Sequence, residues 1–205
     1  MGLTKHLFCR IGWMENYQGQ DDGEELIGGG AFVDETGTGS EIHNFSAEEI
    51  WGEDLGDFVN NDERTQYISM YFGFVMYHGQ INICKLGAGP KDKYIDGITV
   101  FWVAPNPYDG KDRLIGWYKN ARVYRYHSDV EIEYPTNDEC CCNIFARSKD
   151  GVLLPVEERR MIIHRASRYS GGIGQSNVWY AQEPINESIV KSAFNIMKRH
   201  EGLMA

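Results

Sequence analysis

The sequence lacks the motifs of several common enzyme families. Its six histidines include no H-x-x-x-H or H-E-x-x-H spacing, which excludes a zincin-type metal site. No G-x-S-x-G nucleophile elbow occurs, and the glycines at 28–30 are not followed by the lysine and Ser/Thr of a phosphate-binding loop. These absences favour a binding module over an enzyme, with no cofactor and no metal expected.

The chain also lacks long apolar runs and paired cysteines. No stretch of about 18 apolar residues is present, so no membrane span is expected. The first residues lack the apolar core of a signal peptide, which favours a cytoplasmic protein. The five cysteines are an odd number, which argues against a disulfide framework. Three of them are adjacent at 140–142, beside apolar residues, and core packing is the expectation for them.

Basic residues are scarce in the first third of the chain. The formal net charge is −10 over 205 residues, yet residues 1–65 alone carry three basic and fifteen acidic residues. The remainder is weakly positive, with cations concentrated at 111–125 and 147–168. A nucleic acid bound by such a face would show a modest salt dependence, so affinity would have to come from a specific pocket.

What the sequence does contain is a series of short β-branched and aromatic runs. They predict strands at 98–104, 113–118 and 121–126, with others at 67–77 and 81–86. A capping-box pattern at 46–49 predicts a short helix toward Leu55, and apolar spacing predicts a helix at 186–199. We expect one strand-rich α+β domain over 1–205. It comprises an acidic part at 1–65, a core at 67–181 and the C-terminal helix.

Two segments combine aromatic, amide and cationic side chains. The first is the predicted hairpin at 98–125, where turn formers at 105–110 separate the strands and Trp117 stands among lysines and arginines. Aromatic faces can stack on a base, amides can read its edge and cations can hold phosphate. The second segment is 165–180, which begins basic, passes through glycines and ends in polar and aromatic residues. Its expected ligand contacts are Gln175, Ser176, Asn177 and Trp179.

Four short motifs together resemble a known family. They are GWMENY at 12–17, WVA at 102–104, GWYKNA at 116–121 and GQSNVWY at 174–180. The combination resembles the PUA-like reader modules (SRA, EVE and YTH domains) of bacterial modification-dependent restriction systems. The resemblance implies a β-barrel or a strongly curved sheet with few helices. It also implies a DNA-binding module in restriction or defence that accepts a modified, flipped base in an aromatic pocket and works with a separate or fused nuclease.

The resemblance assigns roles residue by residue. The residues implied to bind the nucleobase are Trp13, Asn16, Tyr17, Asn44, Trp117, Tyr118 and Asn120. Those implied to bind phosphate are Lys119, Arg122, Arg125, Arg165 and Arg168. The acidic first third departs from this pattern, because it disfavours strong non-specific DNA binding.

Two alternatives remain open from the sequence. Asp129, Glu131 and Glu133 would share one face of a strand, and such a row of carboxylates could hold the divalent cation of a nuclease or related hydrolase. The same acids could instead keep an exposed edge strand soluble. Alternatively, the acidic first third could bind a partner protein, an interaction that salt would weaken.

Overall fold

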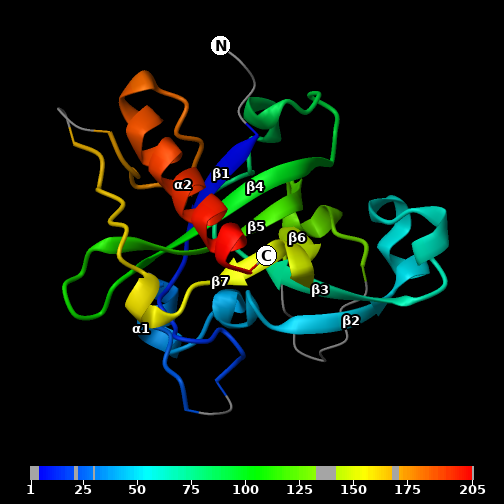
Figure 1. Ribbon diagram of the computed structural model, residues 1–205, viewed down its shortest axis with the longest axis horizontal. Helices are drawn as coiled ribbons and strands as arrows, with labels where there is room; N and C mark the ends of the chain where they lie inside the picture. Colours follow the sequence, from blue (N-terminus) through cyan, green and yellow to red (C-terminus); the bar gives the residue numbers. More distant parts are fainter. Residues whose placement is uncertain (1–4, 21–22, 30, 133–141, 168–170, 205) are drawn as a thin grey trace.

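A long β-hairpin forms the centre of the molecule (Figure 1). Strands β4 (Tyr94–Pro105) and β5 (Asp112–Tyr124) pair antiparallel along nearly their whole length. The computed structural model describes residues 5–20, 23–29, 31–132, 142–167 and 171–204. Within that part of the chain, eight strands form one open sheet in the order β2-β3-β6-β5-β4-β1-β8, with β7 also pairing with β5.

The remaining elements are short, apart from the last helix. The other strands are β1 (His6–Arg10), β2 (Ala47–Trp51), β3 (Tyr67–Gly73), β6 (Ile144–Arg147), β7 (Gly151–Leu153) and β8 (Val178–Trp179). The α-helices are α1 (Ala31–Thr36) and α2 (Glu187–Met204). Short 3₁₀ helices span Ser40–His43, Gly52–Phe58, Asn61–Glu63, Ile83–Leu86, His127–Asp129, Ser148–Asp150, Val156–Glu158 and Pro184–Asn186.

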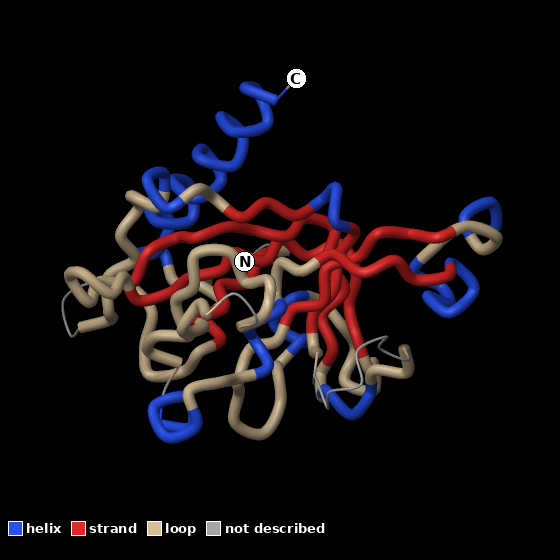
Figure 2. The backbone as a smooth tube through the Cα atoms, turned by 90° about the horizontal axis from the view of Figure 1, so that it is seen from below, coloured by secondary structure: helices blue, strands red, loops and turns tan. Residues whose placement is uncertain are grey.

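Both faces of the central strands are buried. Side chains alternate across a strand, so Phe101 and Val103 face α2, where they pack in one cluster with Ala193. Trp102 belongs to a second cluster on the opposite face. Figure 2 shows loops and short helices on the side of the sheet away from α2. The β1–β4 pair is parallel, while every other strand pair is antiparallel among the described residues. The near-continuous apolar run of β4 is what a strand covered on both sides requires.

The fold class expected from the sequence is confirmed in its coarse form. The structure is strand-rich α+β with few helices, and α2 covers the helix predicted at 186–199. The alternative of a closed barrel is wrong for the described strands, because β2 and β8 lie at opposite ends of the sheet order. The strands predicted at 113–118 and 121–126 are one strand. Asn120, with φ 50°, adopts a left-handed conformation where the β4–β5 register shifts.

The prediction of a helix that begins at Ser46 is also wrong. Residues Ala47–Trp51 form strand β2 instead and pair with β3. A capping box contributes only about 1 kcal/mol locally. The strand gains a full ladder and buries Ile50, so tertiary pairing overrides the local signal. The strand predicted at 81–86 is replaced by the 3₁₀ helix Ile83–Leu86.

We expect Trp117→Ala to destabilise the fold rather than to remove a surface contact. The Trp117 side chain is fully buried between the sheet and α2, and truncation of a buried Trp typically costs about 3–5 kcal/mol. Urea denaturation followed by circular dichroism measures this loss. Tyr108→Ala is the control, since Tyr108 is 87% exposed and its removal should change stability by less than about 0.5 kcal/mol. A loss for Trp117→Ala as small as the control's would contradict the buried position.

Candidate functional site

A polar cavity of about 460 Å³ lies between two loops that are distant in sequence. One loop follows β3, and the other contains β8. The residues that line it are Met76, Tyr77, His78, Gln80, Asn82, Gln175, Ser176, Asn177, Val178 and Tyr180. We refer to it as the amide pocket. Its volume falls within the range of about 300–1,000 Å³ that is typical of small-ligand sites.

The sheet holds both walls of the amide pocket in place. On one side, β8 pairs with β1, and the Arg10 amide donates to the carbonyl of Asn177 at 2.7 Å. On the other side, the Ile81 amide donates to the carbonyl of Arg125, just beyond β5, at 3.0 Å. The amide of Asn82 donates to the Tyr180 hydroxyl at 2.8 Å and joins the two walls directly. The pocket is therefore built on the edge of the sheet rather than on free loops.

The lining of the amide pocket is polar but carries no carboxylate among the described residues. Four side-chain amides, two tyrosines, a serine and a histidine face the cavity, together with Met76 and Val178. The chain has a net charge of −10, yet none of the acids that the structure describes lines this cavity. Such a lining suits a planar polar ligand that stacks on a ring and forms several hydrogen bonds.

Tyr180 stays protonated at neutral pH. Burial raises the pKa of its hydroxyl to about 12. Lys85 lies over the same ring, with its Nζ 4.8 Å from the ring centroid, at a distance typical of a cation–π contact. The ring is thus fixed from two sides, and the hydroxyl remains a neutral group that can donate a hydrogen bond.

The aromatic residues expected to form a base cage lie in the core. Trp117 and Tyr118 have no exposed surface, and Trp13 is 3% exposed. Tyr118 stacks on Tyr71 at a centroid distance of 5.7 Å. This corrects the expected cage, because a base could reach none of these rings without displacing core side chains. The guanidinium of Arg159 also lies 4.9 Å from the Trp13 ring centroid.

The other expected base-contact residues are scattered. Asn44 is fully buried, and its side-chain amide forms two hydrogen bonds with the backbone of Phe74 (3.0 and 2.8 Å). Tyr17 is also fully buried and donates to the Gly12 carbonyl at 2.6 Å. Asn16 and Asn120 are exposed but do not line the amide pocket. The structure therefore does not bring the predicted cage and edge residues together.

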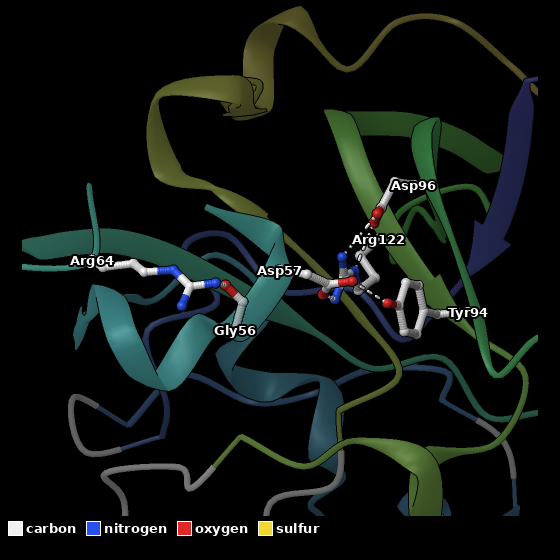
Figure 3. A network of polar contacts seen from close by, with 6 residues as sticks. All are labelled: Gly56, Asp57, Arg64, Tyr94, Asp96 and Arg122. Atoms are coloured by element: carbon white, nitrogen blue, oxygen red, sulfur yellow. Dashed lines mark hydrogen bonds and ion pairs between the residues drawn. The ribbon is translucent and has the colours of Figure 1, made fainter. Parts of the chain in front are cut away.

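The cation expected to bind phosphate at Arg122 is committed to a network within the protein (Figure 3). Its guanidinium is 3% exposed and binds both carboxylate oxygens of Asp96, at 2.6 and 2.8 Å. It also binds Asp57 at 2.6 Å and lies 3.8 Å from the ring centroid of Tyr94, whose hydroxyl donates to Asp57. The network ties the 3₁₀ helix Gly52–Phe58 to the central hairpin. Arg122 is therefore not available to a phosphate.

The remaining predicted phosphate ligands differ in their surroundings. Arg125 is buried and donates to the carbonyls of Asp92 and Gly89 at 2.9 and 3.0 Å. Lys119 pairs with Glu201 of α2 at 2.6 Å. Arg165 keeps 54% of its side chain exposed and lies 3.4 Å from Asp112. Arg168 lies outside the described residues.

The predicted ligand segment at 165–180, unlike the hairpin at 98–125, contributes residues to the amide pocket. Gln175, Ser176 and Asn177 all line the amide pocket, whereas Trp179 packs on Phe8 at a centroid distance of 5.0 Å. Sequence reasoning missed the opposite wall at Tyr77, Gln80 and Asn82. Its only local signal was a polar break, with Gly79 at φ 77°, between two apolar runs.

The carboxylates of the nuclease alternative do not form a metal site in the described part of the chain. Glu131 pairs with Lys93 at 2.8 Å, and both side chains are exposed. Glu133 lies outside the described residues. No group of three or more His, Cys, Asp or Glu side chains with metal-binding geometry occurs within residues that the structure describes.

No protein-family model, curated protein or solved structure matches this chain. The site must therefore be interpreted from its own geometry. Among the helices that the structure describes, none has the length and apolar character needed to cross a bilayer.

We expect Arg122→Met to reduce stability by about 2 kcal/mol. Loss of one partner of a fully buried pair costs about 3–5 kcal/mol, and the smaller value reflects the partial exposure of Asp57 and Asp96. Chemical denaturation at neutral pH measures the change. Lys93→Met breaks the exposed pair with Glu131 and serves as the control, because an exposed pair contributes little to stability. Equal effects of the two substitutions would contradict a structural role for the Arg122 network.

The same network should make stability depend on pH. The hydrogen bond from Tyr94, followed by that from Arg122, lowers the pKa of Asp57 below its ordinary value of 3.8. A lowered folded-state pKa stabilises the protein above that ordinary value, and this contribution is lost as the pH falls through the folded-state pKa. The free energy of unfolding should therefore fall below about pH 4, and less steeply in Arg122→Met. Parallel acid profiles of the two proteins would rule out this linkage.

Proposed function

We propose that this protein is a DNA-binding module that recognises a modified nucleobase, and that the amide pocket receives the base. The observation that carries the proposal is the pocket's lining of amides, hydroxyls and tyrosine rings, with no acid among its described residues. A nucleobase needs these groups, since its faces stack and its edges carry both donors and acceptors. The stacking role moves from the buried tryptophans to Tyr77 and Tyr180.

The energetics of base entry fit a pocket of this kind. Extrusion of a base from a duplex costs a few kcal/mol of unstacking and unpairing. Stacking on an aromatic side chain returns about 1–3 kcal/mol per base, and hydrogen bonds to the base edge supply the remainder. Lys85 and His78 are exposed at or beside the pocket and would contact the phosphates that flank the base. Lys85 is the lysine beside the pocket, and with so little positive charge there, binding would depend weakly on salt.

A reader of this kind would act with a nuclease, supplied as a partner or a fused domain, in restriction or defence. The chief competing function is a protein-interaction domain that uses the acidic residues 1–65. The two functions differ in what the pocket does, because an acidic interaction surface would not depend on the polar lining at 76–82 and 175–180.

The test is a fluorescence-anisotropy titration of the full chain at physiological salt. Matched oligonucleotides carry cytosine, 5-methylcytosine, 5-hydroxymethylcytosine, N6-methyladenine or a phosphorothioate. We expect one modified oligonucleotide to bind at least tenfold more tightly than its plain counterpart, which corresponds to about 1.4 kcal/mol. We expect Gln175→Trp to remove that preference, because Gln175 is exposed and the indole would fill the cavity.

The matched control is Gln66→Trp. Gln66 is also exposed, but it lines a separate cavity that shares no residue with the amide pocket. This variant should bind as the wild type does. Equal affinity for modified and plain DNA would refute the reader function, and equal effects of the two tryptophan variants would show that the amide pocket is not the binding site.

A further inference from the structure

Three polar groups in the amide pocket each accept one hydrogen bond from within the protein, which leaves their donors for a ligand. The first is Gln80, whose Oε1 accepts a hydrogen bond from the Arg125 guanidinium at 3.2 Å. A guanidinium has only donors, so the amide atom that faces it must be oxygen. The Gln80 amide therefore keeps both N–H donors for a ligand, whereas one lone pair of its oxygen is used by Arg125.

The second and third groups are hydroxyls. Tyr180 Oη accepts from the backbone amide of Asn82 at 2.8 Å, and Ser176 Oγ accepts from the backbone amide of Val178 at 3.2 Å. Neither hydroxyl has an acceptor for its own proton among the described residues. Each hydroxyl oxygen already accepts one hydrogen bond while its proton remains available, so each hydroxyl favours donation to a ligand.

Arg125 fixes the orientation of the Gln80 amide in the pocket. It is 9% exposed, and its donors are held by the carbonyls of Asp92 and Gly89 and by the sulfur of Cys84, at 2.9, 3.0 and 3.6 Å. Because arginine stays charged at any accessible pH, Gln80 cannot reverse its amide without losing this contact. Arg125 is thus a positioning residue rather than a phosphate ligand.

The other three side-chain amides of the pocket have no fixed orientation that would disfavour a ligand with acceptor atoms. The side chains of Asn82, Gln175 and Asn177 line the cavity without a hydrogen bond to another residue in the described part of the chain. They can turn either amide atom toward a ligand. The three fixed groups therefore decide which edge the pocket prefers.

We infer that the amide pocket selects a ligand edge composed of hydrogen-bond acceptors without a donor. This inference deepens the proposed function and rests on it for the identity of the ligand as a base. A flipped base presents all of its edges: guanine offers adjacent acceptors at O6 and N7 and cytosine at N3 and O2, whereas adenine pairs its N7 acceptor with an amino donor. A phosphate group has the same acceptor chemistry, so the experiment must separate the two sources.

The experiment is a calorimetric titration of the full chain with free deoxynucleosides and with inorganic phosphate. Deoxyguanosine should bind at least tenfold more tightly than deoxyadenosine and than 7-deaza-deoxyguanosine, which lacks the N7 acceptor. Gln80→Glu should weaken deoxyguanosine binding at least tenfold, because a carboxylate keeps the acceptor that faces Arg125 and replaces the N–H donors with a second acceptor. The same variant should shift the preference toward deoxyadenosine, a reversal that general loss of structure would not produce.

Two controls accompany this titration. Gln66→Glu adds the same charge outside the amide pocket and should leave deoxyguanosine binding unchanged. Tyr180→Phe keeps the ring and removes one donor, and it should weaken deoxyguanosine more than deoxyadenosine. If inorganic phosphate binds Gln80→Glu more weakly than the wild type while neither deoxynucleoside binds, the acceptor group is an anion, and the guanine-type edge is refuted.

The outcomes separate this inference from the proposed function. If Gln175→Trp abolishes DNA binding while guanine and adenine bind equally and Gln80→Glu changes neither, the pocket binds DNA and the donor selection is wrong. If no DNA binds but deoxyguanosine does, with the expected selectivity, the selection stands and the proposed function fails. If no probe binds, both are overturned.

Discussion

The burial of the β4–β5 hairpin on both faces is the constraint on which the rest of this structure depends. Helix α2 covers one face through Ala193 and Met197, while loops and 3₁₀ helices cover the other. Trp102, Trp117 and Tyr118 are fully buried in these two interfaces. Recognition chemistry is therefore confined to the sheet's periphery, where β8 and the loop after β3 bring polar side chains together.

Buried cations have a consistent role in this arrangement. Arg122 joins the acidic 3₁₀ segment to the hairpin, Arg159 binds the carbonyls of Met14 and Leu154 at 2.6 and 2.8 Å, and Arg125 fixes the wall of the amide pocket. Each guanidinium binds several acceptors. Those of Arg159 and Arg125 include backbone carbonyls, whereas the Asp57 and Asp96 carboxylates that bind Arg122 are partly exposed. Arg122, Arg125 and Lys119 of the basic run at 111–125 thus form contacts within the protein. Composition alone had predicted that this run binds nucleic acid.

The sequence predicted those features that depend on local patterns. The hairpin and α2 follow from runs of apolar residues and from turn formers. Gln175, Ser176 and Asn177, predicted to contact a ligand, line the amide pocket, and their ligand contacts stay a prediction. The position of Trp117 was misjudged, although the unbroken apolar run at 98–104 is typical of a strand covered on both sides. The wall at 77–82 could not be predicted, because it faces Tyr180 only through contacts nearly a hundred residues apart in sequence.

The attachment of α2 has a consequence for how this chain can be handled. The helix touches the sheet mainly through side chains and contributes no strand to it. A chain cut before Glu187 would keep its ladder but expose Phe101, Trp117 and their apolar neighbours to water. An uncovered patch of this kind is a common cause of self-association. The C-terminal helix therefore protects this apolar face of the sheet from self-association. A shortened chain should retain the helix.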